Sequence, residues 1–151
     1  MHSAENESEK NDFAIRVLLV DDETGYLNVL SNRLAKRAIH AVKASSGTEA
    51  IQILRKNDFD VVVLDLKMED MDGIEVLKVI KRMVPELPVI ILTGHGSQTA
   101  AKEGVEFGAF DYLSKPCELQ ELLDKIHEAS QSLNNAGDDN GRDDSSRETP
   151  A

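Results

Sequence analysis

Three short segments of the chain are apolar, and mostly β-branched, at nearly every position: residues 15–20 (IRVLLV), 60–66 (DVVVLDL) and 87–93 (LPVIILT). A strand of this kind has no polar side to turn towards water, so it must be buried on both faces. Such strands are typical of a parallel sheet that has helices packed above and below it. The more mixed segments 39–44 and 109–114 are predicted to be the edge strands of the same sheet.

Segments with helical periodicity separate these strands. Two of them begin with sequences that are typical helix N-terminal caps: Ser46 with Glu49, and Asp72 with Glu75. Residues 97–108 form a weaker helical pattern, because a glycine interrupts it and its apolar face is thin. The order βαβαβαβαβα predicts a doubly wound α/β fold, the flavodoxin-like (βα)5 architecture, in a single domain.

The folded domain is predicted to span residues 13–133. Residues 1–12 and 134–151 are acidic and nearly free of large apolar side chains, so we expect both ends to be disordered. The net charge of −11 argues against nucleic acid or an anionic membrane as a partner. Cys117 is the only cysteine, which excludes an internal disulfide. A signal sequence and a membrane-length apolar run are both missing from this sequence, so we expect a cytoplasmic protein.

Polar residues stand where the predicted strands end. Asp21 and Asp22 follow the first strand, Asp65 ends the third, Thr93 ends the fourth and Lys115 follows the fifth. Ligands of open α/β sheets bind beyond the carboxyl ends of the strands. We therefore expect these five side chains to lie together at one edge of the sheet.

Three carboxylates in one place repel each other unless a proton or a cation neutralises them. A divalent cation and the ammonium group of Lys115 would balance the charge, and a set of oxygen ligands favours Mg²⁺ over zinc or copper. Mg²⁺, an ammonium and a hydroxyl together can stabilise a phosphoryl group, which the remaining carboxylate would attack. A single aspartate at a strand end is more often a turn or a helix cap, and this reading stays open for Asp21.

Four segments, in this order, resemble the motifs of the receiver domains of bacterial response regulators, the CheY-like family: VLLVDDE, VVVLDLKMEDMDG, VIILTGHGS and YLSKPCELQELL. The resemblance covers nearly all of residues 15–130. It implies a parallel five-stranded sheet of order 2-1-3-4-5. It also implies a two-component or phosphorelay protein that a histidine kinase or histidine phosphotransfer protein phosphorylates in a Mg²⁺-dependent reaction, in which Mn²⁺ could replace Mg²⁺.

The resemblance implies a role for each residue of the site. Asp65 matches the phosphoacceptor. Asp22 matches the residue that binds the metal directly, and Asp21 the one that acts mostly through water. Asp65 itself and the backbone carbonyl of Lys67 match the other protein ligands of the metal.

Further matches concern the switch. Thr93 matches the hydroxyl residue that moves towards the phosphoryl group, and Lys115 matches the lysine that pairs with this group. The Lys115–Pro116 bond matches a cis peptide. Tyr112 matches an aromatic side chain whose rotamer reports activation, although plain packing explains an aromatic residue on an edge strand equally well.

The resemblance implies a signalling switch that does not turn over an external substrate. This sequence has no output domain after residue 133, so the expected output is binding of an unknown protein to the face built by the fourth helix, fifth strand and fifth helix. We expect a monomer or a weak homodimer. Two residues depart from the family pattern: Glu69 replaces a common proline and Cys117 replaces a common phenylalanine, and both changes are expected to loosen their surroundings.

Two other functions are compatible with an α/β fold. A phosphohydrolase of the haloacid-dehalogenase type also uses an aspartyl nucleophile, but in a D-x-D sequence after its first strand, whereas Asp65 follows the third. A flavodoxin-like cofactor binder would have a Ser-, Thr- and Gly-rich phosphate loop after the first strand, where this chain has three acids. Turnover of phosphate monoesters would favour the first alternative, and a bound flavin the second.

Overall fold

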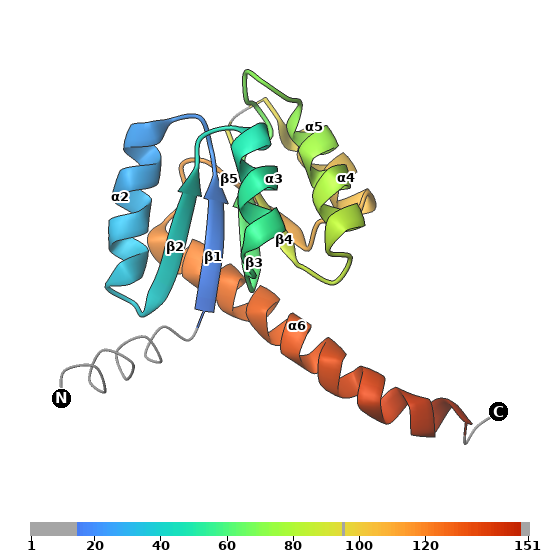
Figure 1. The fold of residues 1–151 in the computed structure, drawn as a ribbon. Coiled ribbons are helices and arrows are strands. Elements are labelled where there is room, and N and C mark those ends of the chain that lie inside the picture. Colours follow the sequence, from blue (N-terminus) through green and yellow to red (C-terminus); the bar gives the residue numbers. More distant parts are fainter. Residues whose placement is uncertain (1–14, 95, 149–151) are drawn as a thin grey trace.

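The structure, a computed structural model, describes residues 15–94 and 96–148, with side-chain surroundings as far as residue 133. Five parallel strands form one sheet in the order β2-β1-β3-β4-β5, as predicted (Figure 1). The strands are β1 (Ile15–Val20), β2 (Ile39–Ala44), β3 (Val61–Leu64), β4 (Val89–Thr93) and β5 (Asp111–Ser114). The two segments of mixed polarity, β2 and β5, form the edges of the sheet.

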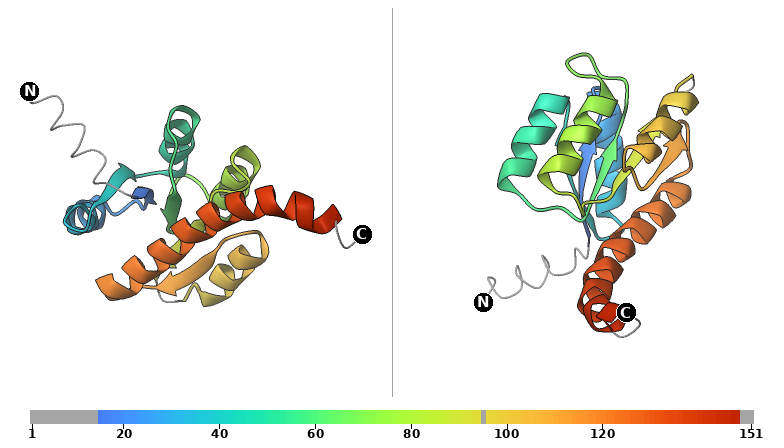
Figure 2. Two further views of the ribbon diagram at one scale, coloured as in Figure 1. Left: turned by 90° about the horizontal axis from the view of Figure 1, so that it is seen from below. Right: turned by 90° about the vertical axis from the view of Figure 1, so that its right-hand side faces the viewer.

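Helices cover both faces of the sheet. They are α2 (Thr24–Ala35), α3 (Gly47–Lys56), α4 (Gly73–Met83), α5 (Gln98–Glu106) and α6 (Leu119–Glu148). The helices α3, α4 and α5 pack on one face, and α2 and α6 pack on the other (Figures 1 and 2). This three-layer arrangement is the doubly wound fold that the sequence predicted.

The side chains of β1 show why its sequence is apolar throughout. Leu18 and Val20 are buried in the layer beneath α3, α4 and α5, whereas Val17 and Leu19 are buried in the layer beneath α2 and α6. Successive side chains of a strand point to opposite faces, so a strand between two helical layers needs apolar residues at every position. The burial of the sheet on both faces is therefore confirmed.

The predicted helix starts are also confirmed. The Ser46 hydroxyl accepts a hydrogen bond from the backbone amide of Glu49 at 3.0 Å, which caps α3. The Asp72 carboxylate accepts one from the amide of Ile74 at 3.2 Å, which caps α4. The carboxylate of Glu49 bonds back to the amide of Ser45, one residue before the position expected in a capping box.

The weak helical pattern of α5 has a packing reason. A Cβ atom added at Gly104 would overlap with the Cδ1 atom of Ile91 on β4. The helix therefore lies so close to the sheet that a side chain at this position would force the buried end of Ile91 to move. The glycine that weakens the helix locally is what allows its close packing.

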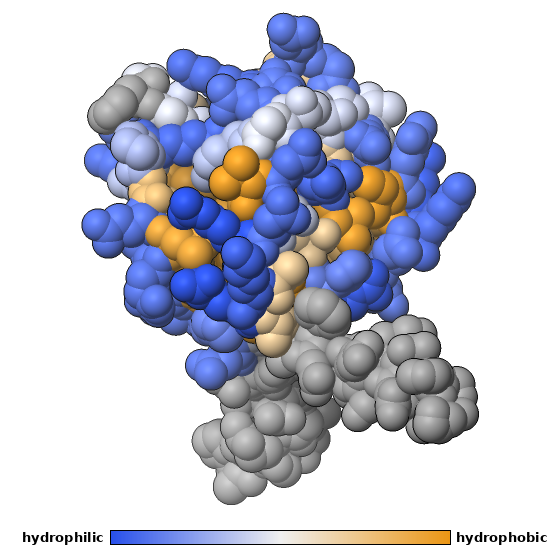
Figure 3. All heavy atoms as spheres, turned by 90° about the vertical axis from the view of Figure 1, so that its left-hand side faces the viewer, coloured by the Kyte–Doolittle hydropathy of each residue, from blue (hydrophilic) through white to orange (hydrophobic). Residues whose placement is uncertain are grey.

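The helix α2 is amphipathic. It buries Leu27, Leu30 and Leu34 against the sheet, as their spacing predicts. Figure 3 shows the outer side of this part of the molecule, where apolar residues appear in separate groups between hydrophilic ones. Val29 is the most exposed of the large apolar residues described, with 55% of its surface accessible.

The last helix extends past residue 133, where the predicted domain ends. It continues to Glu148, although residues 134–151 were expected to be disordered (Figure 1). A helix whose first turns are fixed by packing can extend without a new and costly nucleation step, which gives a polar segment a route to helical structure. The predicted disordered segment 1–12 lies outside the described residues, and the division of the chain at residues 13 and 133 stays a prediction.

Candidate functional site

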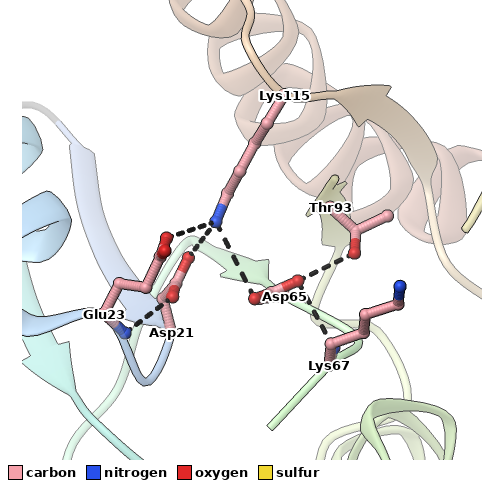
Figure 4. A network of polar contacts seen from close by, with 6 residues as sticks. All are labelled: Asp21, Glu23, Asp65, Lys67, Thr93 and Lys115. Carbon is pink, nitrogen blue, oxygen red and sulfur yellow. Dashed lines mark hydrogen bonds and ion pairs between the residues drawn. The ribbon is translucent and has the colours of Figure 1, made fainter. Parts of the chain in front are cut away.

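The carboxyl ends of four strands bring the predicted residues to one edge of the sheet, where Figure 4 shows Asp21, Asp65, Thr93 and Lys115. The main-chain hydrogen bonds of the sheet continue just past the strands: the amide of Asp65 donates to the carbonyl of Val20 at 2.9 Å, and the amide of Lys115 donates to that of Thr93 at 2.7 Å. These bonds fix the backbone from which the polar side chains project, so the sheet itself determines their separation.

Asp21, Asp22 and Asp65 form a cluster of acids. Each offers a carboxylate oxygen, and these oxygens lie within 4.8 Å of one another. Asp21 and Asp65 are only 3% and 7% exposed, whereas Asp22 is more accessible. The cluster therefore combines like charges with burial, which is unfavourable unless cations lie nearby.

The side chain of Lys115 supplies one such cation. Its Nζ atom lies 2.6 Å from Oδ2 of Asp21, 3.3 Å from Oε1 of Glu23 and 3.8 Å from Oδ2 of Asp65 (Figure 4). It also lies 4.5 Å from the centre of the Tyr26 ring, where a cation–π contact is favourable. The ammonium group is thus held among three carboxylates and one aromatic face.

Burial and charge act in opposite directions on this pair. Burial raises the pKa of Asp21 above its ordinary value, although the hydrogen bond from Lys115 lowers it. Burial alone would lower the pKa of Lys115, but the hydrogen bond and charge of Asp21, with the charge of Asp65, raise it above its ordinary value. Lys115 therefore remains charged, whereas burial disfavours the charged form of the Asp21 carboxylate.

The two oxygens of Asp65 have different partners. The hydroxyl of Thr93, a residue that is only 2% exposed, donates a hydrogen bond to Oδ1 at 2.8 Å, and the amide of Lys67 approaches the same oxygen at 3.4 Å. Oδ2 is the oxygen nearest to Lys115. The carboxylate is consequently held in a fixed orientation by groups from three different segments of the chain.

Tyr112 lies on β5, and Pro116 directly follows Lys115. The half-buried ring of Tyr112 packs against the core layer beneath α3, α4 and α5, which fits the packing role that the sequence left open. The Lys115–Pro116 peptide is cis, the form that the resemblance implies. Cys117 is half-buried against the layer of α2 and α6, and burial raises the pKa of its thiol.

Sequence reasoning missed the roles of Glu23 and Tyr26. Glu23 was visible as a third acid after the first strand, but nothing in its position indicated that it would contact Lys115. Tyr26 lies on the first turn of α2, where its spacing suggests packing alone. Asp21 also stabilises a turn, which was the alternative interpretation of this residue. Its Oδ1 accepts a hydrogen bond from the amide of Glu23 at 2.9 Å.

The fold and the acid cluster can be compared with those of known proteins. The model of the response regulator receiver domain matches residues 17–127. The chain belongs to this family.

Individual relatives support the assignment. The chain is 37% identical over 127 residues to the transcriptional regulatory protein GlrR of Escherichia coli, covering 84% of this chain and 29% of GlrR. It is 39% identical to ZraR of Salmonella typhimurium, covering 74% of the chain and 26% of ZraR. A receiver domain structure from Clostridium thermocellum superposes with a TM-score of 0.70 at 37% identity, covering 81% of this chain and 93% of that one. The chain therefore spans less than a third of the length of GlrR and of ZraR.

Family membership decides between the functions that the sequence left open. Receiver domains are signalling switches of two-component systems, not enzymes that turn over a substrate, and they interact with histidine kinases or phosphotransfer proteins. They bind Mg²⁺ through an acidic cluster, and Asp21, Asp22 and Asp65 form such a cluster here. Among residues 15–94 and 96–148, no helix has the length and apolar character needed to cross a membrane.

Proposed function

We propose that this domain is switched by transfer of a phosphoryl group to Asp65 from a phosphohistidine of a kinase or phosphotransfer protein. The observation that carries the proposal is the surroundings of the Asp65 carboxylate, with Thr93 at 2.8 Å from one oxygen and Lys115 at 3.8 Å from the other. A nucleophile needs its attacking oxygen oriented, and the transferred group needs positive charge and a hydrogen-bond donor nearby. The three side chains meet both needs.

The acid cluster fits a hard divalent cation. Its donors are all oxygens, and they lie close enough to share one ion. Asp21, Asp22, Asp65 and the backbone carbonyl of Lys67 are the groups that would hold Mg²⁺, or Mn²⁺ in its place. When bound, the cation would neutralise the charge that the phosphoryl oxygens bring to the site.

The transfer is a displacement at phosphorus. A carboxylate oxygen of Asp65 forms a bond to phosphorus while the phosphorus–nitrogen bond of the phosphohistidine breaks. The leaving imidazole nitrogen keeps the electron pair of that bond and takes up a proton from solvent. The ammonium group of Lys115, which its carboxylate partners keep charged, then pairs with the new phosphoryl oxygens.

The same step changes the contacts of Thr93. Its hydroxyl donates to Asp65 before transfer and would donate to a phosphoryl oxygen afterwards. Thr93 ends β4, directly before the loop that leads to α5, and its carbonyl bonds to the amide of Lys115 after β5. The α5-β5-α6 face, which is built by the fourth helix, fifth strand and fifth helix of the domain, is therefore the surface that would respond to phosphorylation. It would also bind a downstream protein.

Phosphorylation of the purified chain by a small phosphodonor tests the proposal. Wild type with acetyl phosphate and Mg²⁺ should gain the mass of one phosphoryl group, as an acyl phosphate that hydroxylamine removes. Asp65→Asn should gain none, because an amide is not a nucleophile of this kind. Chelation of the Mg²⁺ should abolish the reaction of wild type.

The matched control is Asp60→Asn. Asp60 lies just before β3, at the opposite end of the same strand, and its carboxylate accepts a hydrogen bond from the amide of Arg16. This variant carries the same chemical change away from the acid cluster and should be phosphorylated like wild type. Equal phosphorylation of Asp65→Asn and wild type would show that another residue is the acceptor.

A further inference from the structure

The loop between β3 and α4 carries the backbone carbonyl of Lys67, which the proposed function assigns to the cation. The loop is closed at its base. Lys67 pairs with Asp72 in an isolated antiparallel bridge, and the amide of Gly73 donates to the carbonyl of Leu66 at 2.9 Å. A Cβ atom at Gly73 would overlap with the backbone of Leu66, so the two ends of the loop are in direct contact.

The outer part of the loop is tied to a different helix by Asp70. Its Oδ1 accepts a hydrogen bond from the amide of Gly47 at 3.1 Å. Its Oδ2 accepts one from the amide of Thr48 at 3.0 Å and one from the Thr48 hydroxyl at 2.9 Å. These donors belong to the first turn of α3, where backbone amides have no partner within the helix. The two amide hydrogen bonds lower the pKa of Asp70, so the carboxylate is charged at neutral pH.

Asp70 shares the N-terminus of α3 with Ser46. The Ser46 hydroxyl already accepts from the amide of Glu49, and Asp70 accepts from the two amides before it. Ser46 lies next to the helix in sequence, whereas Asp70 reaches it from the loop after β3. One cap therefore acts within the helix, and the other joins the helix to the loop beside the acid cluster.

The loop departs from the common family pattern directly before Asp70, where Glu69 stands in place of a proline. A proline restricts the backbone of a loop, whereas Glu69 is exposed and imposes no such restriction. On the other side of Asp70, Met71 is half-buried against the core and contacts the start of α3, because a Cβ atom at Gly47 would lie 3.1 Å from its Sδ atom. The attachment to α3 thus supplies a constraint that the loop sequence lacks.

We propose that Asp70 is a positioning residue for the cation site: by tying the β3–α4 loop to α3, it holds the carbonyl of Lys67 where a metal ligand is needed. This inference rests on the proposed function, because it assigns that carbonyl to the metal. Groups behind the ligands of a metal commonly orient them, and their loss weakens metal binding. Asp70 exerts this effect through the backbone of the loop.

Calorimetric titration of purified variants of the 151-residue chain with Mg²⁺ tests the proposal. Asp70→Ala should weaken Mg²⁺ binding about tenfold, which is the lower end of effects seen for residues behind metal ligands. Asp70→Asn keeps an oxygen acceptor for the α3 amides and should recover part of that loss. In the metal-free protein, Asp70→Ala should also speed hydrogen exchange of the loop amides of Lys67 and Gly73.

Two controls separate positioning from simpler effects. Ser46→Ala removes a cap from the same helix without touching the loop, so it should destabilise the fold by a similar amount and leave Mg²⁺ affinity within roughly twofold of wild type. Glu69→Gln removes one exposed charge from the neighbouring position, and solvent screening should limit its effect to roughly twofold as well.

The possible outcomes are distinct. The inference is wrong if Asp70→Ala binds Mg²⁺ as tightly as Ser46→Ala does, or if Glu69→Gln weakens binding as much as Asp70→Ala. Wild type that fails to bind Mg²⁺ would instead refute the metal site of the proposed function. In that case the exchange rates of Lys67 and Gly73 still decide whether Asp70 holds the loop.

Discussion

Replacement of Asp21 by Asn is expected to stabilise the metal-free protein and to weaken its binding of Mg²⁺. At an effective dielectric constant of about 20, repulsion from the two other acids, whose oxygens lie within 4.8 Å, amounts to at least roughly 7 kcal/mol, and attraction by Lys115 at 2.6 Å to roughly 6 kcal/mol. These terms nearly cancel, so the burial of the Asp21 side chain, which is only 4% exposed, decides the sign. The amide keeps the shape without the charge, and Lys115 keeps Glu23 and Asp65 as carboxylate partners, so the free energy of unfolding should increase by about 1–2 kcal/mol.

The gain should depend on pH. Because the pKa of Asp21 is raised in the folded state, the wild-type protein is favoured by the bound proton below pH 3.8, and this advantage is lost as the pH rises through the raised pKa. The Asn side chain does not ionise in this pH range, so the variant does not lose stability in this way as the pH rises. The two proteins should therefore differ little in stability at pH 3 and most at neutral pH.

Urea and thermal unfolding in the presence of a chelator measure the difference. At neutral pH, Asp21→Asn should raise Tm by roughly 3–10 °C. Addition of Mg²⁺ should narrow or reverse the difference, because a tenfold loss of affinity removes about 1.4 kcal/mol of stabilisation at saturating metal. Glu106→Gln, which removes an exposed charge from α5, is the control for net charge. An Asp21→Asn variant that is less stable than wild type without metal would refute the reasoning.

Three further changes test other contacts. Gly104→Ala should destabilise the fold by about 1–3 kcal/mol in urea unfolding, because the added methyl group overlaps with Ile91 despite a better helix propensity; a stabilised variant would contradict this packing. Thr93→Val should slow phosphorylation by acetyl phosphate while Thr93→Ser retains it, since only Ser can donate to Asp65; equal rates would show that the hydroxyl is dispensable. Lys115→Met should reduce the loss of stability that is expected of wild type above pH 10.5, where the raised pKa of the lysine is passed; an unchanged alkaline unfolding profile would rule out this ion-pair contribution.

Much of the fold follows from local patterns in the sequence. Strands that are apolar at every position fit only between two helical layers, and the mixed segments 39–44 and 109–114 fit only at the edges. The caps at Ser46 and Asp72 depend on residues two or three positions away, so they too can be read directly. Parallel strands end at the same edge, which is why the positions of the polar residues along the chain were enough to bring them together.

The sequence alone determined that three acids, a threonine and a lysine meet at one edge of a parallel sheet. Tertiary structure decided how they are arranged: Lys115 sits between Asp21 and Glu23, and Asp70 reaches the first turn of α3. It also decided that Gly104 is a point of close packing. The physical reason is that hydrogen bonds and ion pairs require separations correct to a few tenths of an ångström between segments far apart in the chain, and no local periodicity specifies such distances.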